Sequence, residues 1–317
     1  MKKIISLLIF GGLLLTACSS SEEAPGANDK ALSDTPILLQ VGDLEMTTRA
    51  GQEVQNKQFD RNQYLDIYIE EHLESGQYAS TVYNNGSAMK YQTTDNRGTL
   101  RPSSSMFPYF PSNGRGVDIM GVYPSDASLS SLTVQNDQSD AQNDKYRKSD
   151  LMLSKHSNVA RTKNAVALTF KHMLSKINIT LTVPDGADVS ILNNAKVTLT
   201  NVARTVNWDP TKSDEEGDEI ISTTVGNTGS VVVTSDGSEK SSAIIVPQTF
   251  ADGYFMKIEL SNGDILNYYL AQTLTFKSGT KNNFTITVDE KQLRVKYAVE
   301  PWDDNSGNNI TNDDVSL

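Results

Sequence analysis

The sequence predicts an all-β protein built as two tandem β-sandwich domains. Short runs of alternating apolar and polar residues recur along the chain between turn-rich segments, at the spacing of an all-β sandwich. Thr, Ser and Asn are abundant, and few segments favour a helix. The 317 residues, of which 37% are hydrophobic, suffice for about two domains that each bury a core.

Charge and cysteine content exclude several classes of partner. The net charge of −11 makes nucleic acids and anionic lipid headgroups unfavourable partners. The chain has one cysteine, Cys18, and therefore no pair for a disulfide and no thiolate set for a metal. After the apolar N-terminal run, we expect no segment long and apolar enough to span a membrane.

Residues 1–17 have the pattern of a signal peptide. Two lysines precede an apolar run from Ile4 to Leu15, and small residues follow at the expected cleavage site. The run is too short to span a bilayer. The letters LTAC, ending at Cys18, resemble a lipobox, in which the thiol is acylated and becomes the new N-terminus. The alternative is an ordinary secretory signal with a chance cysteine. We expect lipidation at Cys18 and a lipidated propeptide over residues 18–49.

A polar linker and a short strand follow within the propeptide. Residues 19–35 are small and polar and will not fold alone. The Ser and Glu residues directly after Cys18 resemble an export signal of surface lipoproteins. The alternative is that this segment is only a solvated tether. Ile37, Leu39 and Val41 then alternate, which predicts a strand that ends at a Gly-Asp turn.

Arg49 follows this strand among small residues, in the letters TTRAG. Small, flexible neighbours let a protease bind the segment in an extended conformation. On these residues alone, Arg49 is either an ordinary loop arginine or a cleavage site that leaves Ala50 as the new N-terminus.

The run from Ala165 to Val183 is the longest apolar-patterned stretch after the N-terminus. Its first apolar residues share one parity and its last share the other: Val166, Leu168, Phe170 and Leu174, then Ile177, Ile179, Leu181 and Val183. Because a strand turns successive side chains to opposite faces, the buried face must switch between Met173 and Lys176, as at a β-bulge or sharp bend. A helix fits several of the same positions; the Ile, Thr and Val of the second half favour the strand.

Further strands are predicted on both sides of this run. Those before it are residues 64–69, 78–83, 89–93, 117–123 and 151–153; those after it are 195–201, 205–208, 219–225, 230–234, 243–246, 254–260, 265–270, 283–288 and 293–299. The turn letters VPDG at 183–186 predict a boundary between domains 50–184 and 185–317.

Three segments between the strands carry predictions of their own. Asn84-Asn85-Gly86 predicts a hairpin turn. Residues 107–111, with the letters FPYFP, are a binding platform or an edge loop in which proline blocks strand addition. Residues 129–148 are polar and predict a long surface loop.

Catalytic and metal-binding patterns are weak. The sequence contains no nucleophile elbow, P-loop or zinc-protease motif. Its three histidines are His72, His156 and His172. His172 lies in phase with buried residues of its strand, which favours a buried, hydrogen-bonded histidine over a ligand or base. Two acidic clusters lack the spacing of a calcium loop and favour solvated loops: Asp214, Glu216 and Asp218, and Asp303 with Asn305 and Gly307. We expect no enzyme activity, no cofactor and no metal.

The letters LTFKHMLSKINITL at residues 168–181 resemble a strand of the fimbrillin family, the subunits of lipoprotein-derived type V pili of Gram-negative anaerobes. Other pieces agree in order: the lipobox Cys18, TTRAG at 47–51, YLDIYI at 64–69, VDIMGVYP at 117–124, SDLMLS at 149–154 and the final strand into Pro301-Trp302. Each piece is short, and their shared order makes the resemblance specific over nearly the whole chain.

The resemblance implies two transthyretin-like, Greek-key sandwich domains and a structural role in a pilus that supports adhesion. It implies export to the outer membrane as a lipoprotein acylated on Cys18. It also implies that an Arg-specific protease cuts between Arg49 and Ala50, which would leave 317 − 49 = 268 residues.

The cut would remove the strand that carries Ile37, Leu39 and Val41 and open an apolar groove. A C-terminal segment of a neighbouring subunit would fill it, and the candidate residues in this chain are Ile310, Val315 and Leu317. The expected partners are other pilus subunits, the maturation protease and the outer membrane, and not nucleic acid.

Two other functions stay open. A tip adhesin or lipid-retained anchor of the same pilus would differ in that a tip does not donate its C-terminal segment and an anchor keeps its lipid. A surface glycan-binding lipoprotein or hydrolase would carry paired carboxylates in a pocket.

Overall fold

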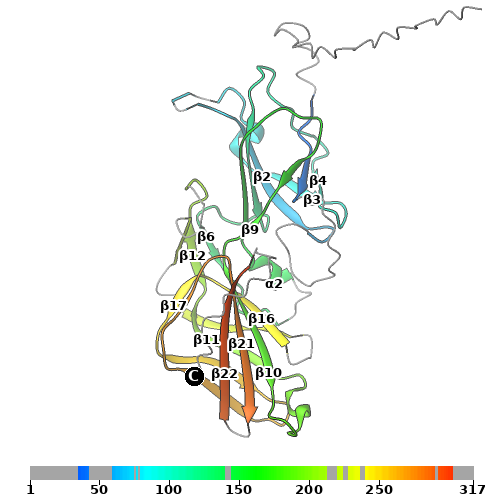
Figure 1. Ribbon diagram of the computed structural model, residues 1–317. Helices are drawn as coiled ribbons and strands as arrows, with labels where there is room; N and C mark the ends of the chain where they lie inside the picture. The colour runs from blue at the N-terminus through cyan, green and yellow to red at the C-terminus, as the bar shows by residue number, and fades with distance from the viewer. Residues whose placement is uncertain are drawn as a thin grey trace, which may run out of the picture.

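The computed structural model describes residues 35–42, 59–74, 76–77, 79–139, 144–212, 220–223, 228–235, 240–289 and 292–302. Over these residues the chain is almost entirely β, which confirms the predicted all-β class. Figure 1 shows two bodies stacked end to end, one formed by the early strands and one by the late strands. Within the described ranges, no helix has the length and apolar character needed to span a membrane.

The N-terminal body is an eight-stranded sheet around one apolar core. The strand order is β8-β1-β4-β3-β2-β5-β7-β9. In that order the strands are Val166–Leu168, Leu39–Val41, Thr99–Pro102, Met89–Thr93, Tyr64–Glu71, Val117–Tyr123, Met152–Val159 and Lys171–His172. The edge strands β8 and β9 are separated in the chain by only Thr169 and Phe170, so the two edges approach each other and the sheet curls around its core.

The C-terminal body contains a five-stranded sheet and a four-stranded sheet. The first has the order β15 (Thr234–Ser235), β16 (Lys240–Ile245), β10 (Ser175–Thr182), β21 (Thr280–Asp289) and β22 (Gln292–Pro301). The second has the order β14 (Thr228–Val232), β11 (Lys196–Ala203), β18 (Gly253–Glu259) and β19 (Ile265–Leu270). The pair β17 (Gln248–Phe250) and β20 (Leu274–Phe276) and the short 3-10 helix η2 (Val189–Leu192) complete it. Both sheets contribute to one core, as expected of a sandwich.

A third apolar cluster lies where the two bodies meet. There β12 (Thr205–Trp208) pairs with β13 (Ile221–Thr223) and with β6 (Ser131–Thr133), a strand from the earlier part of the chain. The short helix α2 (Asp144–Lys148) buries Tyr146 in the same cluster. Figure 1 shows β6, β12 and α2 at this level of the molecule.

The surface loop predicted over residues 129–148 is therefore wrong. This segment contains β6 and α2, and Gln138 is fully buried. The Gln138 side chain donates to the Ile244 carbonyl and accepts from the Ile244 amide, each at 2.9 Å. The polar composition of the segment predicted exposure, and Gln138 is nevertheless buried. A buried amide side chain is stable when its donor and its acceptor are both hydrogen-bonded.

The change of buried face predicted between Met173 and Lys176 is confirmed. Residues 172–177 are all buried, and the chain passes there from β9 of the first sheet to β10 of the second. Because β10 pairs with β16 and β21, the boundary predicted at residue 184 comes after a strand that belongs to the C-terminal body.

Three local predictions near β2 have different outcomes. Asn84 and Asn85 adopt the left-handed backbone expected of them, with φ of 50° and 54° in the 3-10 turn η1 (Tyr83–Gly86). The predicted hairpin is wrong, because β3, the strand after this turn, pairs with β2 and β4 and not with the described residues directly before η1. The strand predicted over 78–83 is wrong, because within its described residues only Val82 forms a bridge, to Glu70.

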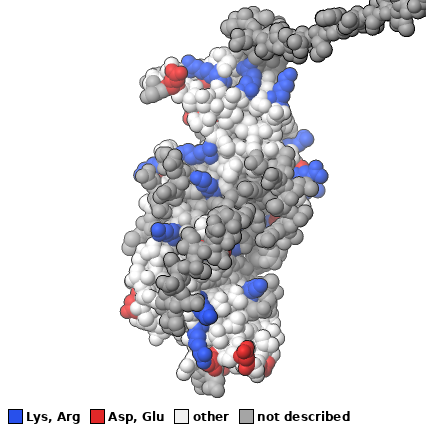
Figure 2. Space-filling model, viewed as in Figure 1, with Lys and Arg blue, Asp and Glu red and all other residues white. Residues whose placement is uncertain are grey.

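Charged side chains are dispersed over the surface. Figure 2 shows the Lys and Arg side chains of the described residues spread from one end of the visible face to the other. Acidic side chains are visible mainly near the two ends of the same face.

Candidate functional site

Strand β1 occupies a strand-shaped space inside the eight-stranded sheet, which we name the β1 groove. It pairs antiparallel with β4, with Leu39 opposite Leu100, and parallel with β8, with Leu39 opposite Val166 and Val41 opposite Leu168. In the strand order β8-β1-β4, β1 is the only described strand that joins β8 to the sheet. Without β1, both β4 and β8 would present unpaired backbone groups.

The apolar side chains of this segment are buried in the N-terminal core. Ile37, Leu39 and Val41 are 0%, 2% and 1% exposed and belong to the cluster that contains Phe110 and Phe170. The alternation that predicted a strand thus places all three on the inner face. Burial of three such side chains contributes roughly 1.5–3 kcal/mol each before the cost of ordering the chain.

Backbone hydrogen bonds extend the groove beyond the three residues of β1. The Ile37 amide donates to the Pro108 carbonyl at 2.8 Å, and the Phe110 amide donates to the Thr35 carbonyl at 3.0 Å. Pro36 also forms a β-bridge with Tyr109. The letters FPYFP are thus neither a platform nor a free edge loop, because Pro108 to Phe110 bind the chain that precedes β1.

Gly98 lets the backbone of β1 approach the turn between β3 and β4. Its φ is +85°, and a Cβ atom placed on it would lie 2.9 Å from the Val41 carbonyl oxygen. The Val41 amide donates to the Gly98 carbonyl at 2.8 Å. Both the left-handed backbone and the close contact therefore require glycine here.

Asp95 fixes the turn that presents Gly98. Its carboxylate accepts hydrogen bonds from the amides of Arg97, at 2.9 Å, and Thr99, at 3.0 Å, and from the Thr99 hydroxyl at 2.8 Å. Burial opposes ionisation, but these donors outweigh it and lower the pKa of Asp95. The ionised carboxylate therefore preorganises one wall of the β1 groove.

Glu71 fixes the loop that follows Phe110. Its buried carboxylate accepts from Asn113 Nδ2 at 2.6 Å, from the Thr81 amide at 3.1 Å and from the Ser80 hydroxyl, and it pairs with Arg115 Nη1 at 3.3 Å. The Ser80 hydroxyl, with help from Asn113 and Arg115 and against the effect of burial, lowers the pKa of Glu71.

We expect Glu71→Gln to lower the free energy of unfolding at neutral pH. Because the folded-state pKa lies below the ordinary value of 4.5, ionisation stabilises the fold above that pH and this contribution is lost as pH falls through the lowered pKa. Urea unfolding of both proteins at falling pH checks this: the difference should shrink. Glu74→Gln, at an exposed position, is the control, and an equal effect of both variants would contradict the role of Glu71.

The described chain resumes after β1 at Phe59, which is fully buried. Its ring meets the rings of Tyr123 and Phe170 edge to face, each at a centroid distance of 5.2 Å. Such aromatic contacts hold the start of this segment in the same core that covers β1.

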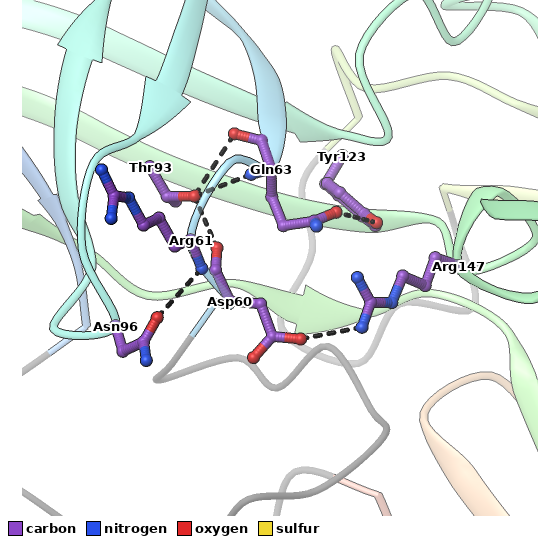
Figure 3. A network of polar contacts seen from close by, with 7 residues as sticks. All are labelled: Asp60, Arg61, Gln63, Thr93, Asn96, Tyr123 and Arg147. Carbon is purple, nitrogen blue, oxygen red and sulfur yellow. Dashed lines mark hydrogen bonds and ion pairs between the residues drawn. The ribbon is translucent and has the colours of Figure 1, made fainter. Parts of the chain in front are cut away.

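A polar network holds the next residues in place (Figure 3). The Thr93 hydroxyl donates to the Asp60 carbonyl at 2.6 Å and accepts from the Gln63 amide at 2.8 Å. The Asp60 carboxylate pairs with Arg147 Nη2 at 2.8 Å, and the Tyr123 hydroxyl donates to Gln63 Oε1 at 3.1 Å. Residues 59–63 are thus anchored to β3, β5 and α2 independently of β1.

Six of the sequence-predicted site residues lie outside the described residues: Cys18, Arg49, Ala50, Ile310, Val315 and Leu317. The predicted cleavage site falls between two described points, Gly42 at the end of β1 and the anchored Phe59. A cut there would separate the strand in the groove from the anchored remainder of the chain.

His172 lies in the junction between the two bodies and is 3% exposed. Its Nδ1 lies 2.8 Å from Asp150 Oδ1, and its ring stacks on Trp302 at a centroid distance of 3.9 Å. Lys176 lies over the same indole, 6.0 Å from the ring centroid, and burial lowers its pKa to about 7. His172, the last of the resembling letters FKH, therefore contacts the final Trp and fixes the chain just after β22 to the N-terminal body.

His72 lies beside Asp118 and Ser157 but does not form a catalytic triad with them. His72 Nδ1 and the Ser157 hydroxyl both bind the same oxygen of Asp118, at 2.8 Å each. A catalytic triad needs the histidine to bridge serine and carboxylate through its two different nitrogens, which is not the case here. Within the described ranges, no group of three His, Cys, Asp or Glu side chains has the geometry to hold a metal.

Sequence comparisons match the chain to fimbrial proteins. The family model described as fimbrillin-like matches residues 48–302. A protein of Bacteroides uniformis described as a fimbrium subunit, Fim1C, is 24% identical in an alignment of 326 residues, gaps included. The alignment covers 98% of each chain.

Solved structures share the fold. A cell adhesion protein of Bacteroides uniformis aligns with a TM-score of 0.64 and 22% identity, over 85% of this chain and 99% of that one. A cell adhesion protein of Bacteroides ovatus aligns with a TM-score of 0.59 and 18% identity, over 84% and 97%. Because the family model covers most of the sequence, this chain belongs to the fimbrillin-like family of pilus subunits.

Proposed function

We propose that the chain is made as a lipoprotein precursor, is cleaved after Arg49, loses β1 and then polymerises into a pilus by strand replacement. The observation that carries this proposal is the position of β1, which is paired on both sides, buried and followed by the segment that contains Arg49. A strand in that position is part of the fold, yet one cut in the connection makes it a separable peptide.

The groove defines what can replace β1. An incoming strand must run antiparallel to β4 and parallel to β8 and must present apolar side chains at alternate positions, as Ile37, Leu39 and Val41 do. A strand that adds to exposed backbone edges gains main-chain hydrogen bonds, and its alternate side chains give specificity. A head-to-tail contact of this kind builds an open filament rather than a closed ring.

The C-terminal segment is the proposed donor. Trp302 is the last described residue, and the 15 residues after it include Ile310, Val315 and Leu317. Val315 and Leu317 have the alternation of a strand. Because the stacked indole of Trp302 anchors the base of this segment at the junction, the residues beyond Trp302 are the part that a neighbouring subunit would bind.

We expect the purified precursor to stay monomeric and to form polymers after treatment with an Arg-specific protease. A chain truncated after Asn309 should be cleaved and stay folded but form no polymers. Size-exclusion chromatography and electron microscopy report assembly, and mass spectrometry reports the cut. Polymers from the truncated chain in undiminished amount would exclude this segment as the donor.

The proposed attachment to the outer membrane depends on Cys18. An acylated Cys18 would keep the propeptide, and with it β1, at the outer membrane, while the cleaved chain from Ala50 joins the filament. The proposed partners are other pilus subunits, the Arg-specific protease and the membrane through the lipid.

A further inference from the structure

A cavity of about 660 Å³ lies on the outer face of the N-terminal sheet. This volume falls within the range of small-molecule sites, roughly 300–1,000 Å³. Strands β2, β5 and β7 and the turn η1 line it, together with Pro210 and Thr211 from the segment after β12. The two bodies therefore both contribute to one concave surface, and the pilus function does not use it.

Strand alternation decides which side chains line this cavity. In β2, Ile67 and Ile69 are buried in the core, so Tyr68 and Glu70 take the opposite face. The β2–β5 register places Tyr68 opposite Met120 and Glu70 opposite Asp118. An apolar row and a pair of carboxylates thus lie side by side, since directly opposed side chains are about 4.5–5.5 Å apart at Cβ.

Several polar groups of the cavity are left available. The Glu70 carboxylate and the Tyr68 hydroxyl make no hydrogen bond with the residues that the structure describes. Asp118 Oδ1 accepts from the Ser157 hydroxyl at 2.8 Å and from the Asn158 amide at 2.7 Å, and His72 Nδ1 lies 2.8 Å away. None of these bonds uses Asp118 Oδ2.

Recognition in this cavity must come from side chains. Strand β5 pairs with β2 on one side and with β7 on the other over most of its length, so its backbone offers no free edge to an added peptide strand. Of the described side chains around the cavity, Lys155 is the one lysine or arginine, and its amino group already donates to the Lys212 carbonyl at 2.9 Å. Two carboxylates without a free cation disfavour an anionic ligand.

We propose that this cavity binds a neutral saccharide. Sugar hydroxyls are donors that suit the carboxylates of Glu70 and Asp118, and each hydroxyl also accepts, which suits the Tyr68 hydroxyl. The apolar face of a sugar ring suits the Tyr68 ring, Met120 and Val82, which is 44% exposed.

Asp118 is suited to bind a sugar hydroxyl rather than to act as the acid of a glycosidase. Glycoside cleavage needs one carboxylic acid with a raised pKa that protonates the leaving oxygen. Burial raises the pKa of Asp118, but hydrogen bonds from Asn158, Ser157 and His72 outweigh that effect and lower it. Asp118 is therefore an acceptor at neutral pH and not a proton donor.

Saturation-transfer NMR and calorimetry on the full chain test the proposal. The neutral probes are lactose, N-acetyllactosamine, maltotriose and mannobiose; 3′-sialyllactose is the anionic counterpart of lactose. At least one neutral probe should bind, and the sialylated probe should bind more weakly than lactose if lactose binds. Tyr68→Ala and Glu70→Gln should each weaken binding about tenfold, through loss of ring contact and of a charged acceptor respectively.

Matched controls separate the site from general effects. Tyr254→Ala removes an exposed tyrosine of β18, and Glu74→Gln removes an exposed carboxylate; neither lines the cavity, so both should leave binding unchanged. Failure of every neutral probe to bind, or binding that survives Tyr68→Ala and Glu70→Gln, would overturn the assignment. Protease-triggered polymerisation of the same variants should be normal, so failure of this proposal leaves the pilus function intact.

Discussion

Gly98→Ala should strongly lower the free energy of unfolding of the precursor and should prevent polymerisation. The new Cβ would lie 2.9 Å from the Val41 carbonyl oxygen and 3.1 Å from Val41 Cβ, and the carbonyl oxygen belongs to backbone that cannot rotate away. Left-handed backbone adds a penalty of about 1–2 kcal/mol for any residue with a Cβ. The clash adds to it roughly 1–3 kcal/mol, the usual cost of overpacking.

Gly186→Ala is the matched control for this variant. Gly186 has φ of +82°, close to that of Gly98, but a Cβ there meets nothing within 4 Å. The difference between the two variants in denaturant unfolding therefore isolates the contact with β1. If a donor strand follows the path of β1, Gly98→Ala should also abolish polymers while Gly186→Ala forms them normally. Equal behaviour of the two variants would show that the groove is not filled in this way.

Leu39→Ala should destabilise the precursor but leave the finished polymer unaffected. Leu39 is 2% exposed, and truncation of a buried leucine costs about 2–5 kcal/mol. If β1 is lost on maturation, the mutated side chain is no longer part of the polymer. The weaker strand should also leave the groove faster, so polymers should form sooner after cleavage.

Leu100→Ala provides the contrast, because Leu100 lies directly opposite Leu39 on β4 and is equally buried. It forms the wall of the groove in both states, so its truncation should weaken precursor and polymer alike. Thermal unfolding of both variants as monomer and as polymer distinguishes the two patterns. A polymer destabilised by Leu39→Ala as much as by Leu100→Ala would mean that β1 stays in place.

Much of the fold was predictable because alternation reports burial directly. The strands at Thr205–Trp208 and Ile265–Leu270 match their predicted bounds, since each side chain there has one clear face. The parity change before Lys176 likewise predicted the transfer from one sheet to the other. Contacts between distant segments were not predictable in the same way, because the local pattern of residues does not indicate a partner far along the chain. The burial of Gln138 against Ile244 is an example.

In the candidate site too, local features were predictable from the sequence and long-range contacts were not. The alternation of Ile37, Leu39 and Val41 predicted a strand, but nothing local indicated that β1 would lie between β4 and β8. Gly98 was missed, although a glycine after Asp95 in a turn is a recognisable signal for left-handed backbone. Tyr68 and Glu70 were missed as cavity residues because their outward parity marks a surface and does not show what lies opposite.

Peptide mapping of purified polymer by mass spectrometry tests the central claim most directly. The account predicts that polymerised subunits begin at Ala50 and lack peptides that cover residues 35–42, whereas the monomeric precursor contains them. Polymers in which every subunit retains residues 35–42 would contradict it, because β1 would then still fill its groove.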